Sequence, residues 1–285
     1  MDIEQLKQTI IKTAVPCGIS SSQVADVKNL VENKSNTQDK FVCEGLWAAE
    51  KLIEKKIVVT DFFFNAEKLD QYDKNTIEKI AKMANYSQKT YSVSEKTCKK
   101  ISDRDGYDEF FIVAKQEKVD FKTIEKMIEK QENVLAIIMD GLEQPGNVGA
   151  ILRSFDCAGG TFAILVNRKA KLNNSRLVRS SLGASFMLPV FEADIAETQM
   201  WLEKNNFKNI ITDLQGKKSY RNADYSGRIA IVAGNEHTGI SDSWRHLKNS
   251  ESVIIPMLGS CESLNVGFAS TLVSYEAGLQ KFDKK

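Results

Sequence analysis

The sequence is poor in the residues that build metal sites and disulfide frameworks. Its 285 residues include only two histidines, and its five cysteines are scattered with no CxxC pair among them. An odd number of dispersed cysteines does not fit a disulfide framework, and two histidines give little support for a zinc site. We therefore expect neither a metal centre nor structural disulfide bonds.

Long apolar runs and an excess of one charge are also missing. No apolar stretch reaches the ~20 residues that a membrane-spanning helix needs. The opening MDIEQLKQTI carries two acidic residues where a signal peptide would have a basic start. We expect a cytoplasmic protein with no membrane partner. Lysine and arginine total 39 against 38 aspartates and glutamates, which excludes a histone-like polyanion binder but not local basic patches.

The usual phosphate-binding loops are absent as well. Neither GxGxxG after a strand nor GxxxxGK[ST] occurs in the chain. Dinucleotide and triphosphate binding therefore lack their common cradles, and an unrelated nucleotide enzyme is disfavoured.

The length predicts two domains, since single domains usually hold ~100 to 200 residues. Residues 1–35 resemble a helical extension that is broken at Val15-Pro16-Cys17-Gly18, with Ser20 to Ser22 available as caps. Residues 36–115 predict a small α/β domain. In it, FVCEGLWAAEKLIEKK is read as a helix with Leu46, Ala49 and Ile53 at helical spacing, and IVVTDFFF, TYSVS and EFFIVA mark strands. The charged stretch 116–132 is expected to be a helical or partly extended linker.

Residues 133–285 show a different pattern, in which short apolar runs alternate with helical segments. The runs are VLAIIM, TFAILV, MLPVF, NIIT, RIAIVAG and SVIIPM. Runs of this kind, without strict alternation, are typical of buried parallel strands in an α/β fold. Ligands of open parallel sheets bind beyond the carboxyl ends of the strands, so the segments that follow these runs are the candidate site.

The segment DGLEQPGNVGAILRSFDCAGG follows the first run. Asn147 is placed to cap a helix whose buried stripe is Val148, Ile151, Leu152 and Phe155. Arg153 lies off that stripe, so packing does not explain it. It is either a solvated surface arginine or a guanidinium directed at a phosphate or a reacting hydroxyl.

Two further strand-end segments carry polar groups. In AGNEHTGISDSW, Gly234 and Gly239 allow a tight turn, and Glu236 either accepts backbone N–H groups or binds a polar ligand. In IIPMLGSCESLNVGFASTLVSYEAG, Asn265 can cap a long last helix. Singly, the remaining polar residues of that loop are ordinary turn residues.

Taken together and in order, NVGAILR, GNEHTGIS and IPMLGSCESLN resemble the three motifs of the SpoU-type RNA ribose 2′-O-methyltransferases of the SPOUT superfamily. The resemblance covers about residues 134 to 280, and the α/β unit that begins at NKSNTQDKFVCEG resembles the substrate-binding domain that often precedes this catalytic domain. It implies an α/β catalytic domain with a parallel sheet and a deep C-terminal trefoil knot, a homodimer, and S-adenosylmethionine as cofactor.

The resemblance also implies roles for individual residues. The positions that match the polar active centre are Asn147, Arg153, Glu236, Ser263 and Asn265. Those that match the cofactor site are Gly234, Asn235, Ile255, Met257 and Leu264. One subunit's arginine can work near the other subunit's cofactor. The chain departs from the family pattern at Ser154 and in VGFAST, which puts Phe268 near the expected dimer interface.

Two basic clusters are candidates for RNA contact. Residues 168–179, RKAKLNNSRLVR, contain Arg168, Lys169, Lys171, Arg176 and Arg179 and no acidic residue, and a second cluster holds Lys217, Lys218 and Arg221. Such clusters suit phosphate contacts whose strength falls steeply with salt. The alternative for each residue is a solvated loop.

The function that these observations favour is S-adenosylmethionine-dependent 2′-O-methylation of a ribose in RNA, with ribosomal RNA preferred because the paired substrate-binding domain is frequent among rRNA-modifying relatives. A tRNA substrate is the first alternative. A non-catalytic RNA-binding or ribosome-assembly factor with the same fold is the second, and the intact polar set of Asn147, Arg153, Glu236 and Asn265 argues against it.

Overall fold

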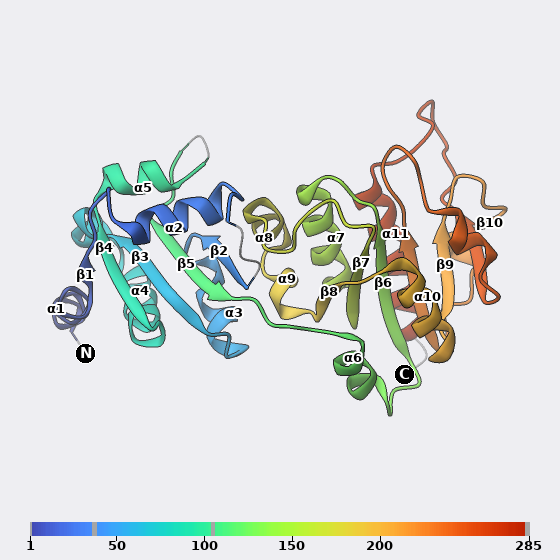
Figure 1. Cartoon of the computed structure of the whole chain (residues 1–285), viewed down its shortest axis with the longest axis horizontal. Coiled ribbons are helices and arrows are strands. Elements are labelled where there is room, and N and C mark those ends of the chain that lie inside the picture. The colour runs from blue at the N-terminus through green and yellow to red at the C-terminus, as the bar shows by residue number, and fades with distance from the viewer. Residues whose placement is uncertain (1, 36–38, 104–105, 283–285) are drawn as a thin grey trace. The chain divides into compact units, whose positions relative to one another are not determined.

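The computed structural model describes residues 2–35, 39–103 and 106–282, and it divides into two compact units (Figure 1). Unit 1 comprises Met1–Glu117 with Asn173–Gly183, and unit 2 comprises Lys118–Leu172 with Ala184–Lys285. The change from one unit to the other at residue 117 falls at the start of the stretch that the sequence predicts as a linker.

Unit 1 is built on a five-stranded mixed sheet. Its strands are β1 (Val15–Pro16), β2 (Lys40–Glu44), β3 (Val59–Asn65), β4 (Lys89–Val93) and β5 (Phe110–Lys115), in the order β1-β4-β3-β5-β2. β1, β4 and β3 are parallel, and β5 runs antiparallel to both β3 and β2. The three predicted strands are present. The sequence analysis missed β1, which has only two residues, and β2, whose residues it assigned to a helix.

Helices cover both faces of this sheet. They are α1 (Ile3–Thr13), α2 (Ser22–Val31), α3 (Ala49–Glu54), α4 (Lys74–Tyr86) and α5 (Glu95–Ile101), with short 3₁₀ turns η1 (Leu46–Ala48) and η2 (Ala66–Gln71). The predicted break after the first helix is confirmed, because α1 ends at Thr13 and Ser21 caps α2 by accepting a hydrogen bond from the N–H of Val24.

The buried face of α3 differs from the predicted one. Ala48, Ala49 and Leu52 are buried, whereas the prediction named Leu46, Ala49 and Ile53. Gly45 has a φ of +99°, a left-handed value that suits glycine, and it ends β2 where the prediction had a helix. The 3₁₀ turn that follows has three residues per turn rather than 3.6, which changes the phase of the buried face.

One segment from the C-terminal half belongs to unit 1. This segment contains α8 (Ser175–Ser181), and its polar groups bind the backbone of unit 1. The Ser175 hydroxyl donates to the carbonyl of Val31 at 2.7 Å, and Arg179 pairs with the nearly buried Glu44 at 3.0 Å. Helix α8 therefore belongs to unit 1, although the predicted domain 133–285 includes its residues. A single boundary along the sequence cannot separate one helix from the segments on either side of it.

Unit 2 contains a seven-stranded sheet in which every pair of neighbours is parallel. Its strands are β6 (Val134–Asp140), β7 (Phe162–Val166), β8 (Val190–Glu192), β9 (Lys208–Thr212), β10 (Lys218–Ser219), β11 (Arg228–Ala233) and β12 (Ser250–Ile254), in the order β10-β12-β9-β11-β6-β7-β8. The six predicted runs form strands, which confirms a parallel α/β fold. The two-residue β10 was missed, in a segment that was read as a loop.

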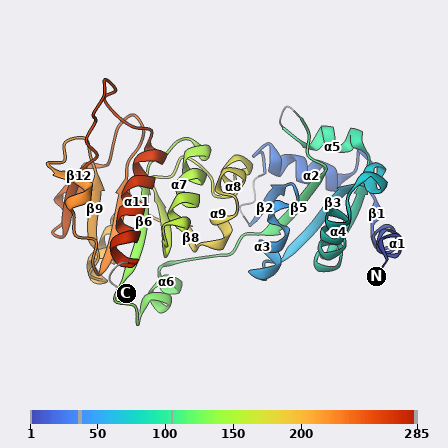
Figure 2. The ribbon, with the colours of Figure 1, turned by 180° about the vertical axis from the view of Figure 1, so that it is seen from behind.

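Two groups of helices cover the sheet of unit 2. α6 (Phe121–Ile128), α10 (Ile195–Lys204) and the turn η4 (Asp242–His246) share one apolar cluster with Ile138 and Ile164 of the strands. α7 (Pro145–Cys157) and α11 (Val266–Phe282) pack together beside β6 (Figure 2). The short α9 (Ala184–Met187) contacts α7, and η3 (Tyr220–Asn222) contacts α11. Part of the predicted linker is thus the helix α6, whose Ile124 and Ile128 are buried in unit 2.

The packing of α7 and α11 is close. The predicted stripe of α7, formed by Val148, Ile151, Leu152 and Phe155, is fully buried. A Cβ on Gly278 of α11 would lie 2.1 Å from the carbonyl oxygen of Ala158, so no larger residue fits there. Among the described residues, no helix combines the length and the apolar content that crossing a membrane requires.

Candidate functional site

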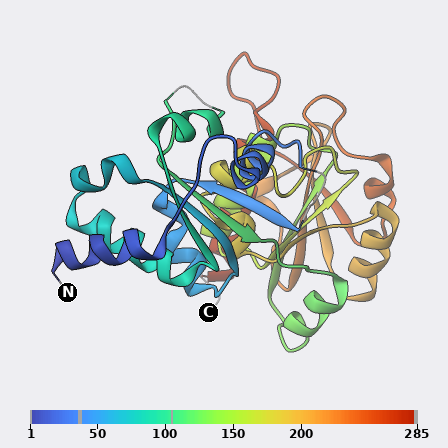
Figure 3. The ribbon, with the colours of Figure 1, turned by 60° about the vertical axis from the view of Figure 1, so that its left-hand side comes forward.

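The candidate site lies at the carboxyl edge of the sheet of unit 2. β12, β9, β11 and β6 are consecutive neighbours and run in the same direction, so the loops that follow them emerge together. The longest of these loops, residues 255–265, is exposed over most of its length and projects beyond the sheet (Figure 3). Segments that are far apart in the sequence therefore meet at this edge.

A buried carboxylate that the sequence analysis did not single out ties the end of β6 to the segments after β7 and β11. Asp140, at the end of β6, is 2% exposed. It accepts hydrogen bonds from the Asn167 amide at 2.7 Å, from the N–H of Ser241 at 2.8 Å and from the Trp244 indole at 3.2 Å. The sequence carried one signal for this residue, since Asp140 is an acidic side chain at the end of an otherwise apolar run. A carboxylate that is buried at such a position needs several hydrogen-bond partners, so it organises the segments around it.

Asn235 sets the shape of the turn after β11. Its side-chain oxygen accepts the N–H groups of His237 and Thr238, at 2.8 and 3.0 Å. Its amide nitrogen donates to the carbonyl of Gly141 at 2.7 Å. Asn235 and Gly239 also exchange two backbone hydrogen bonds. The side chain and the backbone of Asn235 are therefore both engaged within the protein, so Asn235 fixes the shape of the turn that lines the pocket.

Three predicted catalytic residues from three different motifs are joined by hydrogen bonds. The Asn147 amide donates to Glu236 Oε1 at 2.8 Å, and the Asn265 amide donates to Asn147 Oδ1 at 3.4 Å. Asn265 Oδ1 accepts the N–H of Gly267, which confirms the predicted cap of the last helix. The motifs thus converge in space, as the sequence analysis required.

The predicted capping role of Asn147 is wrong. α7 begins at Pro145, with Gln144 at the cap position, and Asn147 lies within the first helical turn. Proline is favoured at the first helical position, since its ring fixes a suitable φ and its missing N–H would have no partner there. This start leaves the Asn147 side chain available to Glu236.

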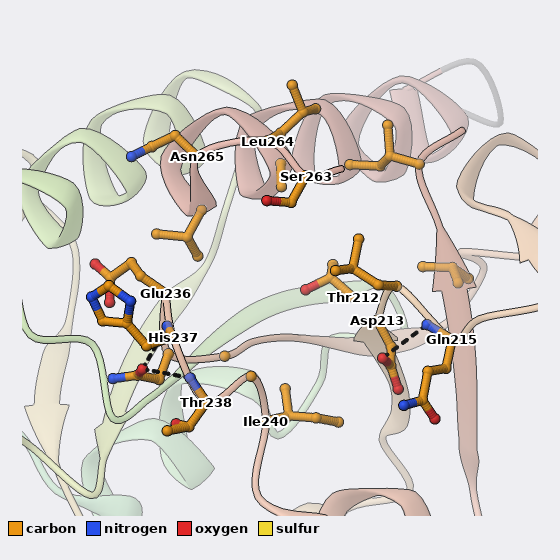
Figure 4. Close-up of a pocket in the computed structure, with 18 of the residues that line it drawn as sticks. Thr212, Asp213, Gln215, Glu236, His237, Thr238, Ile240, Ser263, Leu264 and Asn265 are labelled. Carbon is orange, nitrogen blue, oxygen red and sulfur yellow. Dashed lines mark hydrogen bonds between the residues drawn. The ribbon is translucent and has the colours of Figure 1, made fainter. Parts of the chain in front are cut away.

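A pocket of about 500 Å³ opens beside these residues. The loops after β9 and β11 line one side of it, and Ser263, Leu264 and Asn265 line the other (Figure 4). All the positions predicted for the cofactor contribute to its wall, namely Gly234, Asn235, Ile255, Met257 and Leu264. Backbone amides, hydroxyls and apolar side chains therefore surround one cavity. Within the described part of the chain, no group of three or more His, Cys, Asp or Glu residues could hold a metal ion.

Close backbone contacts shape the pocket. A Cβ on Gly234 would lie 2.5 Å from the carbonyl carbon of Gly239, and a Cβ on Gly216 would lie 2.6 Å from that of Val253. Both distances are shorter than any side chain tolerates. Glycine is therefore required where the loops after β9 and β11 approach the neighbouring backbone.

Arg153 is separated from the other predicted catalytic residues. It is exposed on α7 and does not line the pocket. The structure records no hydrogen bond or ion pair between its guanidinium and another described residue. The arrangement leaves Arg153 available to a group outside the chain.

The residues predicted for RNA contact have acidic partners that the sequence pattern did not reveal. Arg168 pairs with Glu192 at 2.8 Å and Lys169 with Glu143 at 2.5 Å, both within unit 2. Within unit 1, Arg176 lies 4.0 Å from Asp103, and Arg179 binds Glu44. Lys171 is half-buried. Carboxylates from distant segments therefore offset much of the charge of this stretch.

The second basic cluster shows the same effect, since Lys218 pairs with Glu251 at 2.6 Å. Glu251 also binds Lys208, and these two lysines lower the pKa of its carboxyl. Lys217 and Arg221 are both exposed. This cluster is accordingly less positive than its sequence suggests.

Comparison with known proteins shows that the chain is similar to RNA methyltransferases. Residues 134–275 match the model of the SpoU rRNA Methylase family. A 23S rRNA (uridine(2479)-2′-O)-methyltransferase of Streptomyces viridochromogenes is 33% identical over 157 residues, which cover 53% of this chain and 54% of that protein. A protein of Staphylococcus saprophyticus assigned to the TrmH family of tRNA/rRNA methyltransferases is 30% identical over 210 residues, which cover 73% of this chain and 84% of that protein.

Solved structures resemble the chain over most of its length. The structure of an RNA 2′-O ribose methyltransferase superposes on this one with a TM-score of 0.76 and 26% sequence identity. The match covers 94% of this chain and 100% of the other chain. The SpoU methyltransferase AviRb of Streptomyces viridochromogenes, solved in complex with AdoMet, has a TM-score of 0.80 and 23% identity, covering 92% of this chain and 98% of that one. The latter likeness concerns the fold.

Proposed function

The chain belongs to the SpoU rRNA methylase family, and from this premise we propose that it transfers the methyl group of S-adenosylmethionine to the 2′-hydroxyl of a ribose in RNA. The observation that carries the proposal is the linked set of Glu236, Asn147 and Asn265 beside the pocket. Because the chain spans about half the length of the Streptomyces relative, the activity of that protein is extended to this one as a proposal.

The pocket fits S-adenosylmethionine in size and in chemistry. Its volume of about 500 Å³ falls within the ~300–1,000 Å³ typical of small-molecule sites. Gly234 brings the backbone against Gly239, which leaves a cradle of peptide groups for the polar parts of the cofactor. Ile255, Met257 and Leu264 supply apolar surface for the adenine ring, and Asn235 contributes by holding the turn that lines the pocket.

The proposed roles of the polar residues follow from their geometry. When bound, S-adenosylmethionine supplies a methyl group on a positively charged sulfur. The hydroxyl oxygen must be held in line with that methyl group while the hydroxyl loses its proton. Glu236, Asn147 and Asn265 hold the loops on both sides of the pocket in one arrangement, and Ser263 places a hydroxyl on its wall. Donors and acceptors fixed before the reaction stabilise the charge that develops during it.

Arg153 is assigned to the phosphate next to the reacting ribose. A guanidinium stays protonated at neutral pH and binds phosphate through two parallel hydrogen bonds, so it suits clamping better than proton abstraction. It is exposed on α7 and lies outside the pocket of its own chain. In the proposed homodimer, Arg153 of one subunit acts beside the cofactor of the other.

The last helix supports the homodimer. α11 exposes an apolar stripe at helical spacing, formed by Phe268, Leu272, Tyr275, Leu279 and Phe282. Contiguous apolar patches of this kind are rare on monomeric proteins and mark association surfaces. Phe268, noted above as a departure from the family pattern, is 69% exposed and belongs to this stripe.

The proposal includes the trefoil knot of the SPOUT fold. Two features support it. The chain leaves β12 through the long loop 255–265 and returns as α11 against α7 and β11. The loop after β9 also passes very close to the backbone of β12 at Gly216, where a Cβ would lie 2.6 Å from the carbonyl carbon of Val253.

RNA is the proposed partner, and ribosomal RNA is preferred to tRNA. The Streptomyces relative acts on 23S rRNA by name, and the Staphylococcus relative is assigned to a tRNA/rRNA family. Unit 1 is proposed as the RNA-binding domain that precedes the SPOUT domain. Arg168, Lys169, Lys171, Arg176 and Arg179 remain proposed RNA contacts, and the three arginines would exchange their carboxylate partners for phosphates. A cytoplasmic location agrees with such a substrate.

The decisive experiment is transfer of tritium-labelled methyl groups to unmodified rRNA and tRNA pools. We expect label in rRNA, and Arg153→Ala should lower the rate by about 100-fold, as for loss of a charged transition-state contact. Because Arg153 is exposed, the variant should keep its thermal stability and its affinity for S-adenosylmethionine. Absence of label in both pools, with cofactor binding intact, would support the assembly-factor alternative.

A further inference from the structure

Glu143 makes contacts that none of the roles above explains. It follows β6 by three residues, and its Oε1 accepts hydrogen bonds from Lys169 Nζ at 2.5 Å and from the Asn235 amide at 3.3 Å. Its backbone N–H points to Glu236 Oε2 at 3.5 Å. Glu143 does not line the pocket. Glu143 therefore contacts Asn235 and Glu236 in the turn after β11, but it does not face the pocket.

Those two residues control both halves of the site. Asn235 holds the turn whose backbone forms the pocket wall. Glu236 accepts a hydrogen bond from Asn147, which in turn accepts one from Asn265. The Glu143 side chain therefore acts on the cofactor wall through Asn235, whereas its contact with Glu236 is made by the backbone N–H and does not depend on the side chain. Lys169 belongs to the segment after β7 and is the second partner of the same carboxylate oxygen. The ion pair thus links this basic segment to the turn.

We propose that Glu143 is a positioning residue of the methyl-transfer site and that Lys169 anchors it from the segment after β7. The inference rests on the proposed function. The ammonium of Lys169 is the main reason that the pKa of Glu143 lies below its usual value, and Asn235 adds to the effect. The carboxylate is therefore charged at neutral pH, and a charged acceptor binds an amide more strongly than a neutral one.

The pair itself should add little to the stability of the fold. The side chains of Lys169 and Glu143 are 55% and 44% exposed, and ion pairs at such positions are screened by solvent. Replacing either residue should therefore alter the site without unfolding unit 2, so the role in positioning can be measured directly.

The test is Glu143→Gln, which keeps the size of the side chain and removes its charge. Affinity for S-adenosylmethionine in the absence of RNA, measured by calorimetry, should fall about tenfold, as expected for the loss of one charge-assisted hydrogen bond. In methyl-transfer assays the KM for S-adenosylmethionine should rise by a similar factor, while kcat at saturating cofactor should change by less than about threefold. A purely structural role would lower thermal stability instead and would not produce this split.

The chain offers a matched control. Glu125 is also 44% exposed and pairs with one lysine, Lys204, at 2.9 Å, but it lies on α6 and does not contact the turn. Glu125→Gln should leave the cofactor affinity within about twofold of that of the unchanged protein, as surface substitutions usually do.

A double-mutant cycle tests the role of Lys169. Lys169→Met should weaken cofactor binding by about fivefold, and Glu143→Gln with Lys169→Met should be no worse than Glu143→Gln alone, because the two residues act through one contact. Additive losses would overturn the role of Lys169. If Glu143→Gln behaved like Glu125→Gln in a protein that binds the cofactor and methylates RNA, the inference would fail and the proposed function would stand. If the unchanged protein bound no S-adenosylmethionine, both would fail.

Discussion

Each of the two sheets has a cluster of hydrogen-bonded polar side chains at one edge, but the cluster of unit 2 also borders a pocket. In unit 1, the Tyr72 hydroxyl donates to Glu109 Oε2 at 2.7 Å, and Lys68 binds both Glu109 and the hydroxyl of Tyr107. Burial is the main reason that the pKa of Tyr72 is raised, and the pKa of Lys68 is raised by its hydrogen bond to Glu109. In unit 2, Glu236, Asn147 and Asn265 are joined in a comparable chain, but they border a pocket.

Strand direction explains this difference. In unit 1, β5 runs against its neighbours β3 and β2, so the segment before β5, which carries Glu109, lies among the carboxyl ends of the other strands. In unit 2, all the strands are parallel, and the loops after four neighbouring strands emerge at one edge. Convergence of several loops leaves a space between them that a ligand can fill. The lesson is that similar side chains form a closed network in one unit and a binding site in the other.

The substitution expected to disrupt the site of unit 2 most is Gly234→Ala. Its Cβ would lie 2.5 Å from the carbonyl carbon of Gly239, so the turn must move. Overpacking of this kind costs about 1–3 kcal/mol, and affinity for S-adenosylmethionine should fall by up to about 100-fold. Calorimetric titration measures the loss. Gly259→Ala is the control, since nothing lies within 4 Å of its Cβ. Equal affinities of the two variants would contradict the proposed cradle.

A smaller effect is expected at the exposed face of α11. Phe268→Glu combined with Leu279→Glu places charges on the apolar stripe and should convert the proposed dimer into a monomer in sedimentation experiments. Methyl transfer should then fall by about 30-fold, because Arg153 would lose the opposite subunit's cofactor. Met200→Glu, at a single exposed apolar residue of α10, should leave the dimer intact. A fully active monomer would rule out the action of Arg153 across subunits.

The smallest effect is expected in unit 1. Tyr72→Phe removes the hydrogen bond to Glu109 and should lower the free energy of unfolding of unit 1 by about 1 kcal/mol. Hydrogen exchange of the amides in β3 to β5 can report this change. Affinity for S-adenosylmethionine should stay the same, because the closed network has no part in the pocket. A change in affinity for S-adenosylmethionine would contradict the conclusion that the cluster of unit 1 plays no part in cofactor binding.

Local pattern was sufficient for much of the architecture. The apolar runs from Val134 onward predict the parallel strands, and the spacing of Val148, Ile151, Leu152 and Phe155 predicts the buried stripe of α7. These features depend on residues close together in the chain, whose periodicity reflects which face is buried. Short edge strands such as β1 and β10 escape detection, because two residues carry no period.

The three motifs also predict which residues meet, but not how they meet. Asn147 suits a helix cap by its type and place, yet Pro145 begins the helix and Asn147 instead binds Glu236. Asp140 was not singled out, because its three donors come from loops after other strands. Hydrogen-bond partners at such a site are separated by tens of residues along the chain.

By itself, the amino-acid sequence determined six of the seven strands of unit 2, the buried stripe of α7 and the identity of the polar groups at the strand ends. Tertiary structure alone decided that α8 joins unit 1, that carboxylates such as Glu143 and Glu192 neutralise a stretch with no acidic residue of its own, and that Arg153 lies apart from the pocket. The physical reason is the distance along the chain between the residues that interact. Burial periodicity is local, whereas electrostatic and hydrogen-bond partners are brought together only when distant segments fold against one another.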